Sequence, residues 1–198
     1  MDINSPFSYI FGTEIIKEDL SELKKNKVFA NGMHQTSSSE KVNPFTILNK
    51  YKYSNKILTD YFNKFIKQVF NYDCKFAITT SWMTKLGVGE SVHHHNHKNS
   101  MWSAVFYFDE YTENSCALSF MNPIQNEIPV TIGKSKYNAM TKDCAIQPEH
   151  NLLIFFPSWI YHYSDPNKEK ERKSLAFNFM PTGTYGFGDS SYNPEWMT

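Results

Sequence analysis

The chain has 198 residues, of which 40% are hydrophobic and 16% aromatic, and its 20 basic residues balance its 20 acidic ones. Such a composition excludes a disordered polar chain, and the length suits a single domain over residues 1–198 with a sizeable core. Because there is no net charge, neither a nucleic acid nor a membrane surface is expected as a partner.

The N-terminal part, up to about residue 75, is predicted to hold a strand and helices. The segment "EIIKEDLSELKKNK" at 14–27 has the pattern of a short strand followed by a polar helix, and the turn formers of 31–45 predict a loop. From Pro44 to about Phe70, apolar residues recur at spacings of three, four and seven, which is typical of an amphipathic helix with one face on a core. The residues of this stripe are Ile47, Tyr51, Leu58, Phe62, Phe65 and Val69.

After residue 75 the pattern changes to short segments rich in β-branched and aromatic residues. They are "FAITTSWMT", "WSAVFYFDE", "CALSF", "EIPVTIG", "NLLIFFPSWIYHY" and "KSLAFNFMP". Short strands separated by turn residues favour a sandwich or barrel. We therefore predict an α+β, mainly β domain: a jelly-roll core over 76–182, buttressed by one or two helices from the N-terminal side, with a tail loop over 183–198.

The cysteines and the N-terminus bear on the cellular location. Cys74, Cys116 and Cys144 are far apart, odd in number and without a CxxC spacing, which fits a reducing cytosol. Acidic Asp2 stands where a signal peptide would be basic, and no apolar run is long enough to span a bilayer. A cytoplasmic protein is expected.

Four of the seven histidines lie within five positions, in "VHHHNHKNSMW" at 92–102. In an extended chain, residues two apart point the same way, so His93, His95 and His97 share a face while His94 points away. Two imidazoles on one face can converge on one ion, whereas the outer pair of three is too far apart. The pattern predicts half of a metal site and leaves open which pair forms it.

Two later residues complete a candidate site. His162 lies in an otherwise apolar and aromatic run, and a later strand could bring it beside the first histidines. Arg172 opens the predicted strand "RKSLAFNF". Its side chain either faces water or points inward, where the guanidinium could bind a carboxylate through two parallel hydrogen bonds. Aromatic residues of the strands either wall such a pocket or, as is more common, pack in the core; the candidates are Trp82, Trp102, Tyr107, Trp159 and Tyr161.

Several motifs together resemble the 2-oxoglutarate- and Fe(II)-dependent oxygenase superfamily, in the form common in bacteria and tailed marine phages. They are "TTSWMTKLGVGE", "HNHKNSMWSAVFYF", "LLIFFPSWIYHYSDP" and "ERKSLAFNF". The resemblance covers about residues 76–188. It implies a double-stranded β-helix, Fe(II) and 2-oxoglutarate as cofactors, and hydroxylation of an unidentified small-molecule or peptidyl substrate coupled to decarboxylation of 2-oxoglutarate to succinate.

The resemblance also implies a role for individual residues. His95, His97 and His162 take the places of the iron ligands, Arg172 that of the partner of the 2-oxoglutarate C5 carboxylate, and Ser174 that of its helper. Position 97 departs from the superfamily, which has Asp or Glu there. Either His97 completes an all-histidine triad, or a carboxylate such as Asp109 or Asp165 substitutes for it.

Two other functions fit the same residues. A cupin-like dioxygenase with three histidines and no 2-oxo acid predicts that Arg172 faces solvent. A non-catalytic metal-binding jelly-roll phage protein predicts a fourth protein ligand, such as His93 or His94, which closes the site. The substrate would be selected by loops 31–45, 121–150 and 183–198, which are expected at the mouth of the pocket.

Overall fold

The computed structural model describes residues 12–16, 20, 46–123 and 143–197. The polar helix predicted within the segment 14–27, the loop 31–45 and the strand at 127–133 lie mainly or wholly outside these residues. The described part consists of two antiparallel sheets and one long helix, α3 (Lys52–Phe70), so the predicted mainly β fold with a buttressing helix is confirmed. None of the described helices is both long and apolar enough to cross a membrane.

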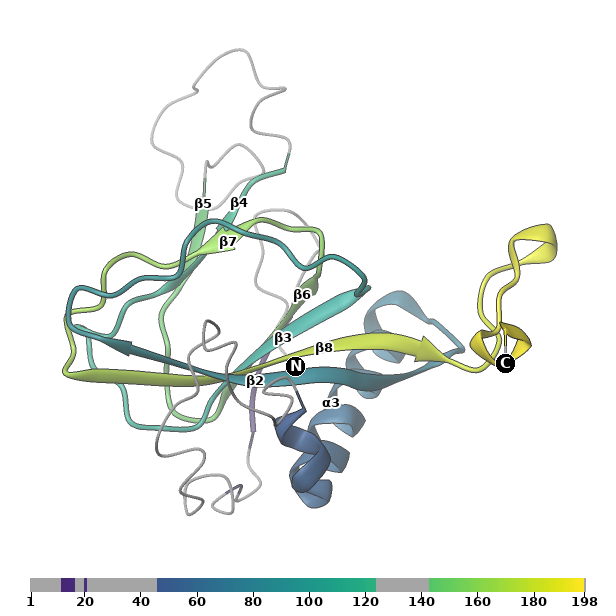
Figure 1. The fold of residues 1–198 in the computed structure, drawn as a ribbon, viewed down its shortest axis with the longest axis horizontal. Helices are drawn as coiled ribbons and strands as arrows, with labels where there is room; N and C mark the ends of the chain where they lie inside the picture. Colours follow the sequence, from purple (N-terminus) through teal and green to yellow (C-terminus); the bar gives the residue numbers. More distant parts are fainter. Residues whose placement is uncertain (1–11, 17–19, 21–45, 124–142, 198) are drawn as a thin grey trace, which may run out of the picture.

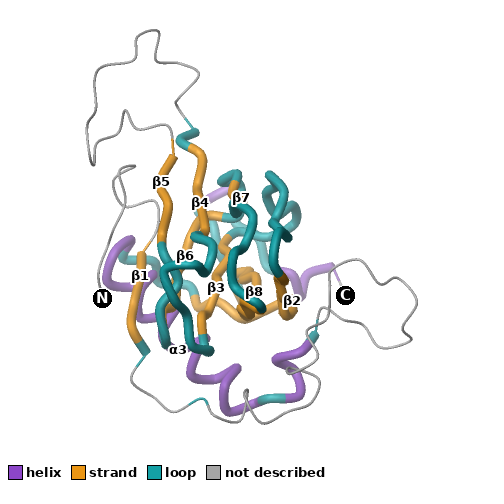
Figure 2. Tube along the Cα trace, turned by 90° about the vertical axis from the view of Figure 1, so that its left-hand side faces the viewer, coloured by secondary structure: helices purple, strands orange, loops and turns teal. Residues whose placement is uncertain are grey.

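The larger sheet has five strands in the order β1-β6-β3-β8-β2. Their bounds are β1 Gly12–Ile15, β2 Lys75–Gly87, β3 Trp102–Tyr107, β6 Leu152–Pro157 and β8 Glu171–Thr182. Figure 2 shows β1 at one edge of this sheet and β2 at the opposite edge. Strands β6, β3 and β8 therefore lie inside the sheet, each hydrogen-bonded to a strand on either side.

The smaller sheet has three strands in the order β5-β4-β7. Their bounds are β4 Leu118–Met121, β5 Asp143–Ile146 and β7 His162–Tyr163. Figure 1 shows this sheet and α3 on opposite sides of the larger sheet, so the protein has three layers. Of the β-rich segments predicted within the described residues, each contributes a strand, and β5 is a strand that the sequence pattern did not predict.

Strand alternation gives the larger sheet two different faces. Leu175, Phe177 and Phe179 of β8 pack on the helix side, whereas Ala176 packs in the core between the two sheets. Because successive side chains of a strand point to opposite faces, Arg172 and Ser174 share the inner face with Ala176. The space between the sheets is thus lined by a row of even-numbered β8 residues.

Helix α3 begins later than the predicted 44–70 range. A 3-10 turn, η1 (Ile47–Lys50), precedes it, and the non-helical backbone of Tyr51 (φ −116°, ψ 71°) separates the two. The Leu48 N–H donates to the Ser81 hydroxyl at 2.9 Å, which ties the turn to β2 instead of extending the helix. The helix ends at Asn71, whose left-handed conformation (φ 53°) is a common helix terminator.

The tail after β8 does not lie at the mouth of the space between the sheets, where it was expected. It forms two short 3-10 turns, η3 (Gly188–Ser190) and η4 (Pro194–Met197), and Figure 1 shows it extending from the end of β8 away from both sheets. A backbone pairing of Tyr185 with Tyr192 closes the tail on itself.

The aromatic contacts of Phe62 predict a large stability effect. Its ring is fully buried and lies 3.9 Å from that of Phe179, 5.2 Å from Phe76 and 5.3 Å from Phe155. Phe62→Ala should lower the free energy of unfolding by about 3–5 kcal/mol, because it removes transfer energy and leaves a cavity. Phe187→Ala is the matched control, since Phe187 is 92% exposed; equal urea-unfolding curves for the two variants would contradict this packing.

Candidate active site

A pair of backbone hydrogen bonds brings His95 beside His162. The His95 N–H donates to the His162 carbonyl at 3.1 Å, and the His162 N–H donates to the His95 carbonyl at 2.9 Å. Directly opposed residues of an antiparallel pair point to the same face, so their imidazoles meet, with ring centroids 4.3 Å apart. His162 is buried at the start of β7.

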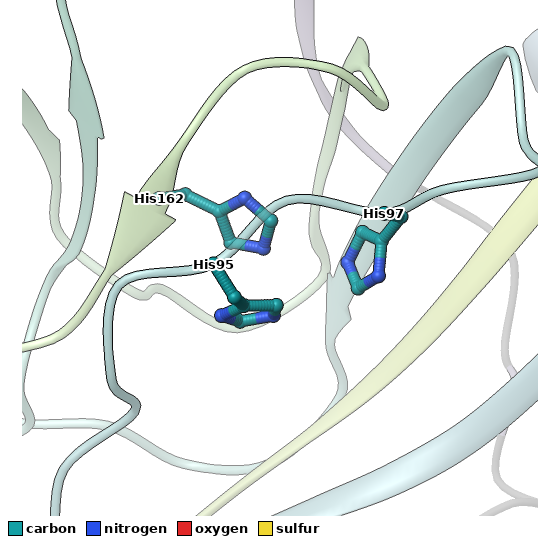
Figure 3. A group of neighbouring side chains, drawn as sticks. All are labelled: His95, His97 and His162. Atoms are coloured by element: carbon teal, nitrogen blue, oxygen red, sulfur yellow. The ribbon is translucent and has the colours of Figure 1, made fainter.

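His97 joins the pair two residues further along the chain. Its ring centroid lies 5.0 Å from that of His95 and 5.1 Å from that of His162. Figure 3 shows the three imidazoles gathered around a common space. One ligand nitrogen from each ring lies within 4.8 Å of the other two, so the three residues could hold a metal ion.

The hydrogen bonds of two imidazoles suit them to metal binding. The Nδ1 atom of His95 is 2.8 Å from the His93 carbonyl, and that of His162 is 3.0 Å from the Ile160 carbonyl. Because a carbonyl only accepts hydrogen bonds, each Nδ1 carries the proton, and the lone pair is then on Nε2. Both rings are oriented by their own chain with Nε2 available as a ligand.

Burial keeps the cluster uncharged. Loss of solvent lowers the pKa of His162 to about 3 and that of His97 to about 4, with a smaller contribution from the neighbouring imidazole of His95. Burial also lowers the pKa of His95 itself. All three rings are therefore neutral at pH 7, the state in which an imidazole binds a metal.

The neighbouring candidates do not join the cluster. The His94 ring stacks on Tyr163 at 4.0 Å. His93 is exposed; its carbonyl accepts from His95 and its ring centroid lies 5.3 Å from that of His95, but its ring nitrogens are not part of the converging group. The Asp109 carboxylate accepts a hydrogen bond from the Glu110 N–H, and Asp165 is exposed. Within the described residues, the structure therefore brings His97, and no carboxylate or fourth histidine, to His95 and His162.

The cavity beside the histidines lies between the two sheets. It is lined by Trp82, Thr84, Val92, His95, His97, Ala104, Val105, Tyr107, Leu118, His162, Arg172, Ser174 and Ala176. Of the five aromatic residues predicted to wall the pocket, it includes Trp82 and Tyr107. The edge of Trp82 faces the ring of His97, with centroids 5.3 Å apart.

The other three aromatic residues are not among those that line this cavity. Trp102 has its side chain on the helix side of β3, where it packs against Phe62, Phe65 and Phe70. Trp159 and Tyr161 are 54% and 49% exposed, because they alternate with the buried Ile160 and His162. Strand parity thus decides which aromatic side chains face the cavity.

Arg172 is buried and faces this cavity. Its Nη2 donates to the Tyr107 hydroxyl at 2.6 Å, and its Cζ lies 5.0 Å from the centroid of that ring. Its buried Nε–H has no hydrogen-bond partner among the described residues. Ser174, two positions along the same face of β8, is also buried and lines the cavity. The solvent-facing Arg172 required by the alternative without a 2-oxo acid is not observed.

The contact of Tyr107 with Arg172 was missed by the sequence analysis, which had placed Tyr107 only as a wall of the pocket. Burial raises the pKa of the Tyr107 phenol, so the phenol keeps its proton. Its oxygen accepts from Arg172, which leaves its own O–H available as a donor. Tyr107 is two positions from Val105 on β3, so both side chains point to the inner face, and this spacing in the sequence could have located Tyr107.

Comparisons with known proteins identify the family of this chain. The model of the family described as "Putative 2OG-Fe(II) oxygenase" matches residues 80–178, and the chain belongs to this family. It is a 2-oxoglutarate-dependent non-haem iron oxygenase with Fe(II) and 2-oxoglutarate as cofactors. The comparison with curated proteins gives no match.

Solved structures share the fold. A prolyl-4-hydroxylase of Pseudomonas putida is 15% identical with a TM-score of 0.56, over 89% of this chain and 95% of that one. The collagen prolyl hydroxylase of Paramecium Bursaria Chlorella virus-1, solved as a 2-oxoglutarate complex, is 9% identical with a TM-score of 0.56, over 87% and 96%. Iron-bound HygX of Streptomyces hygroscopicus is 9% identical with a TM-score of 0.55, over 87% and 82%. The predicted double-stranded β-helix is thereby confirmed.

The neutral histidines make the stability of the metal-free protein depend on pH. The pKa of His162 is about 3 in the folded protein and 6.5 as the ordinary value, so between these pH values protons bind the unfolded chain preferentially. The contribution of His162 to the free energy of unfolding is therefore fully present above pH 6.5. It decreases as the pH falls, by up to about 1.4 kcal/mol per pH unit. His162→Gln should reduce the slope of the free energy of unfolding against pH, measured by urea unfolding between pH 6 and 4. An unchanged slope would contradict the lowered pKa of His162 in the folded protein.

Proposed function

We propose that His95, His97 and His162 are the three protein ligands of Fe(II), and that Arg172 with Ser174 and Tyr107 holds the C5 carboxylate of 2-oxoglutarate. The observation that carries the proposal is that one cavity contains both the three imidazoles and the buried guanidinium. Three ligands on one side leave positions for a cofactor and a substrate, as a catalytic site requires.

The residues fit both groups chemically. The imidazoles are neutral, and two of them have Nδ1 bonded to a carbonyl, which leaves Nε2 as the ligand atom. Arg172 brings a buried positive charge with an unused Nε–H, and Tyr107 brings an unused O–H. A carboxylate between them would receive two hydrogen bonds and neutralise the charge.

Fe(II), when bound with 2-oxoglutarate and O₂, supplies oxidising chemistry in which 2-oxoglutarate is decarboxylated to succinate and a substrate C–H bond is hydroxylated. The chain's own residues hold the two cofactors next to each other. The apolar side chains of Val105, Leu118 and Ala176 line the same cavity as the histidines and Arg172, and they limit the access of water. No side chain beyond the metal site is assigned a catalytic role.

The substrate proposed is a small molecule or a peptidyl side chain. Two of the similar solved structures are prolyl hydroxylases, and this supports a hydroxylation reaction. We further infer one domain over 1–198 and a cytoplasmic location, that of the host cell if a phage encodes the protein. All three cysteines, Cys74, Cys116 and Cys144, are free thiols, which supports a reducing compartment.

Arg172→Ala tests the cofactor assignment. It should raise the KM for 2-oxoglutarate by on the order of a hundredfold, because a buried charged partner of the carboxylate is lost. The measurement is succinate formation by the Fe(II)-loaded protein at varied 2-oxoglutarate concentration.

Lys173→Ala is the matched control for this variant. Lys173 is the next cation along β8, but its side chain pairs with Glu171 and with Asp109 on the other face of the strand. It should leave the KM unchanged. If Arg172→Ala also leaves the KM unchanged, the assignment of Arg172 to the carboxylate is wrong.

A further inference from the structure

A row of polar side chains crosses the inner face of the larger sheet beside the cavity. Thr80 of β2, Asn178 of β8 and Ser103 of β3 are paired in register across three adjacent strands. The Asn178 amide donates to the Thr80 hydroxyl at 3.0 Å, and the Ser103 hydroxyl donates to the Asn178 side-chain oxygen at 2.8 Å. The three side chains thus form a continuous chain of hydrogen bonds.

The row continues to Ser158, which follows β6. The hydroxyl oxygen of Ser158 is 2.7 Å from that of Ser103 and 3.0 Å from that of Ser100. Because the Ser103 proton is donated to Asn178, the Ser158 hydroxyl is the donor to this pair and gives its one proton to Ser103 or to Ser100. Ser158 is fully buried and Ser103 is 1% exposed. Buried hydroxyl groups are costly unless they are hydrogen-bonded, so this row holds its members in fixed positions.

The backbone of Ser158 connects this row to His97. Its carbonyl accepts from the His97 N–H at 2.9 Å, and its own N–H donates to the Met101 carbonyl at 3.1 Å. Ser158 therefore fixes both ends of the segment 97–101. It is held in turn by its side chain, through Ser100 and Ser103.

His97 depends on this support more than the other two histidines do. The rings of His95 and His162 are each oriented by a carbonyl two residues away. The ring of His97 has no hydrogen bond among the described residues; it packs against the edge of Trp82 and against the rings of His95 and His162. Its position is therefore set by its backbone, and so by Ser158.

The adjacent row indicates that packing alone does not require these polar groups. The next position along each of the three strands on the same face is Trp82, Ala176 and Val105, which are all apolar. Apolar side chains would fill the Ser103 and Asn178 positions without the cost of burying polar atoms. A role in positioning His97 explains why polar residues are kept here, since the row ends at Ser158, which is hydrogen-bonded to the His97 backbone.

We propose that Ser103, Ser158 and Asn178 form a positioning network that holds His97 in place for the metal. The proposal rests on the proposed function, in which His97 is a ligand. None of the three residues touches the metal or the substrate in this account. They act only through the backbone hydrogen bond between Ser158 and His97.

Co(II) binding to Ser158→Ala tests the network, with affinity measured by competition and coordination by visible absorption. The variant should bind Co(II) about tenfold more weakly, the lower end of the effect typical of groups that orient metal ligands, with an altered Co(II) spectrum. In a His97→Ala background, the same substitution should cause no further loss. Ser81→Ala is the control, since Ser81 is also buried and its hydroxyl, among the described residues, accepts only from the Leu48 N–H on the helix side.

Ser103→Ala is the second variant if Ser158→Ala does not fold, and it should weaken Co(II) binding in the same way. Wild-type affinity and spectrum in both serine variants would overturn the network, and so would an equal loss in the presence and absence of His97. If His97→Ala itself binds Co(II) as tightly as the wild type, His97 is not a ligand. In that case the proposed function, and with it the network, is overturned.

Discussion

The reciprocal backbone hydrogen bonds between His95 and His162 are the constraint on which the site depends. They join an irregular segment after β2 to the start of β7, two parts of the chain that are distant in sequence. Because opposed residues in an antiparallel pair share a face, this one bridge places both imidazoles in the space between the sheets. His97 is then within reach by the two-residue periodicity of an extended chain.

The two faces of the larger sheet have different roles: one packs in the aromatic core, and the other lines the cavity. On the helix side, β8 presents Phe177 and Phe179 to Phe62 and the rest of an aromatic core. On the inner side, the same strand presents Arg172 and Ser174 to the cavity. The guanidinium is buried because it lies on a strand covered on both faces, and burial makes an ionic partner of opposite charge favourable there.

The sequence predicted much of this arrangement because the deciding signals are local. The spacing of Phe62 and Phe65 predicted the helix, and the HxH pattern with a later His162 predicted the cluster. The strand β5 was missed because Asp143–Ile146 is short and lacks an aromatic residue. Trp102, Trp159 and Tyr161 were misplaced because parity depends on the exact register of each strand. The Tyr107–Arg172 contact and the Ser103–Ser158 contact join residues that only the folded chain brings together.

The central claim is that an all-histidine centre binds Fe(II) in the same cavity in which Arg172 binds 2-oxoglutarate. The most direct measurement is an anaerobic titration of the Fe(II)-loaded protein with 2-oxoglutarate, followed by visible absorption. A metal-to-ligand charge-transfer band that grows with 2-oxoglutarate, and that is absent from His162→Ala, is the predicted result, since it requires the 2-oxo acid to be bound to the iron. Tight Fe(II) binding with no such band at saturating 2-oxoglutarate would contradict the account.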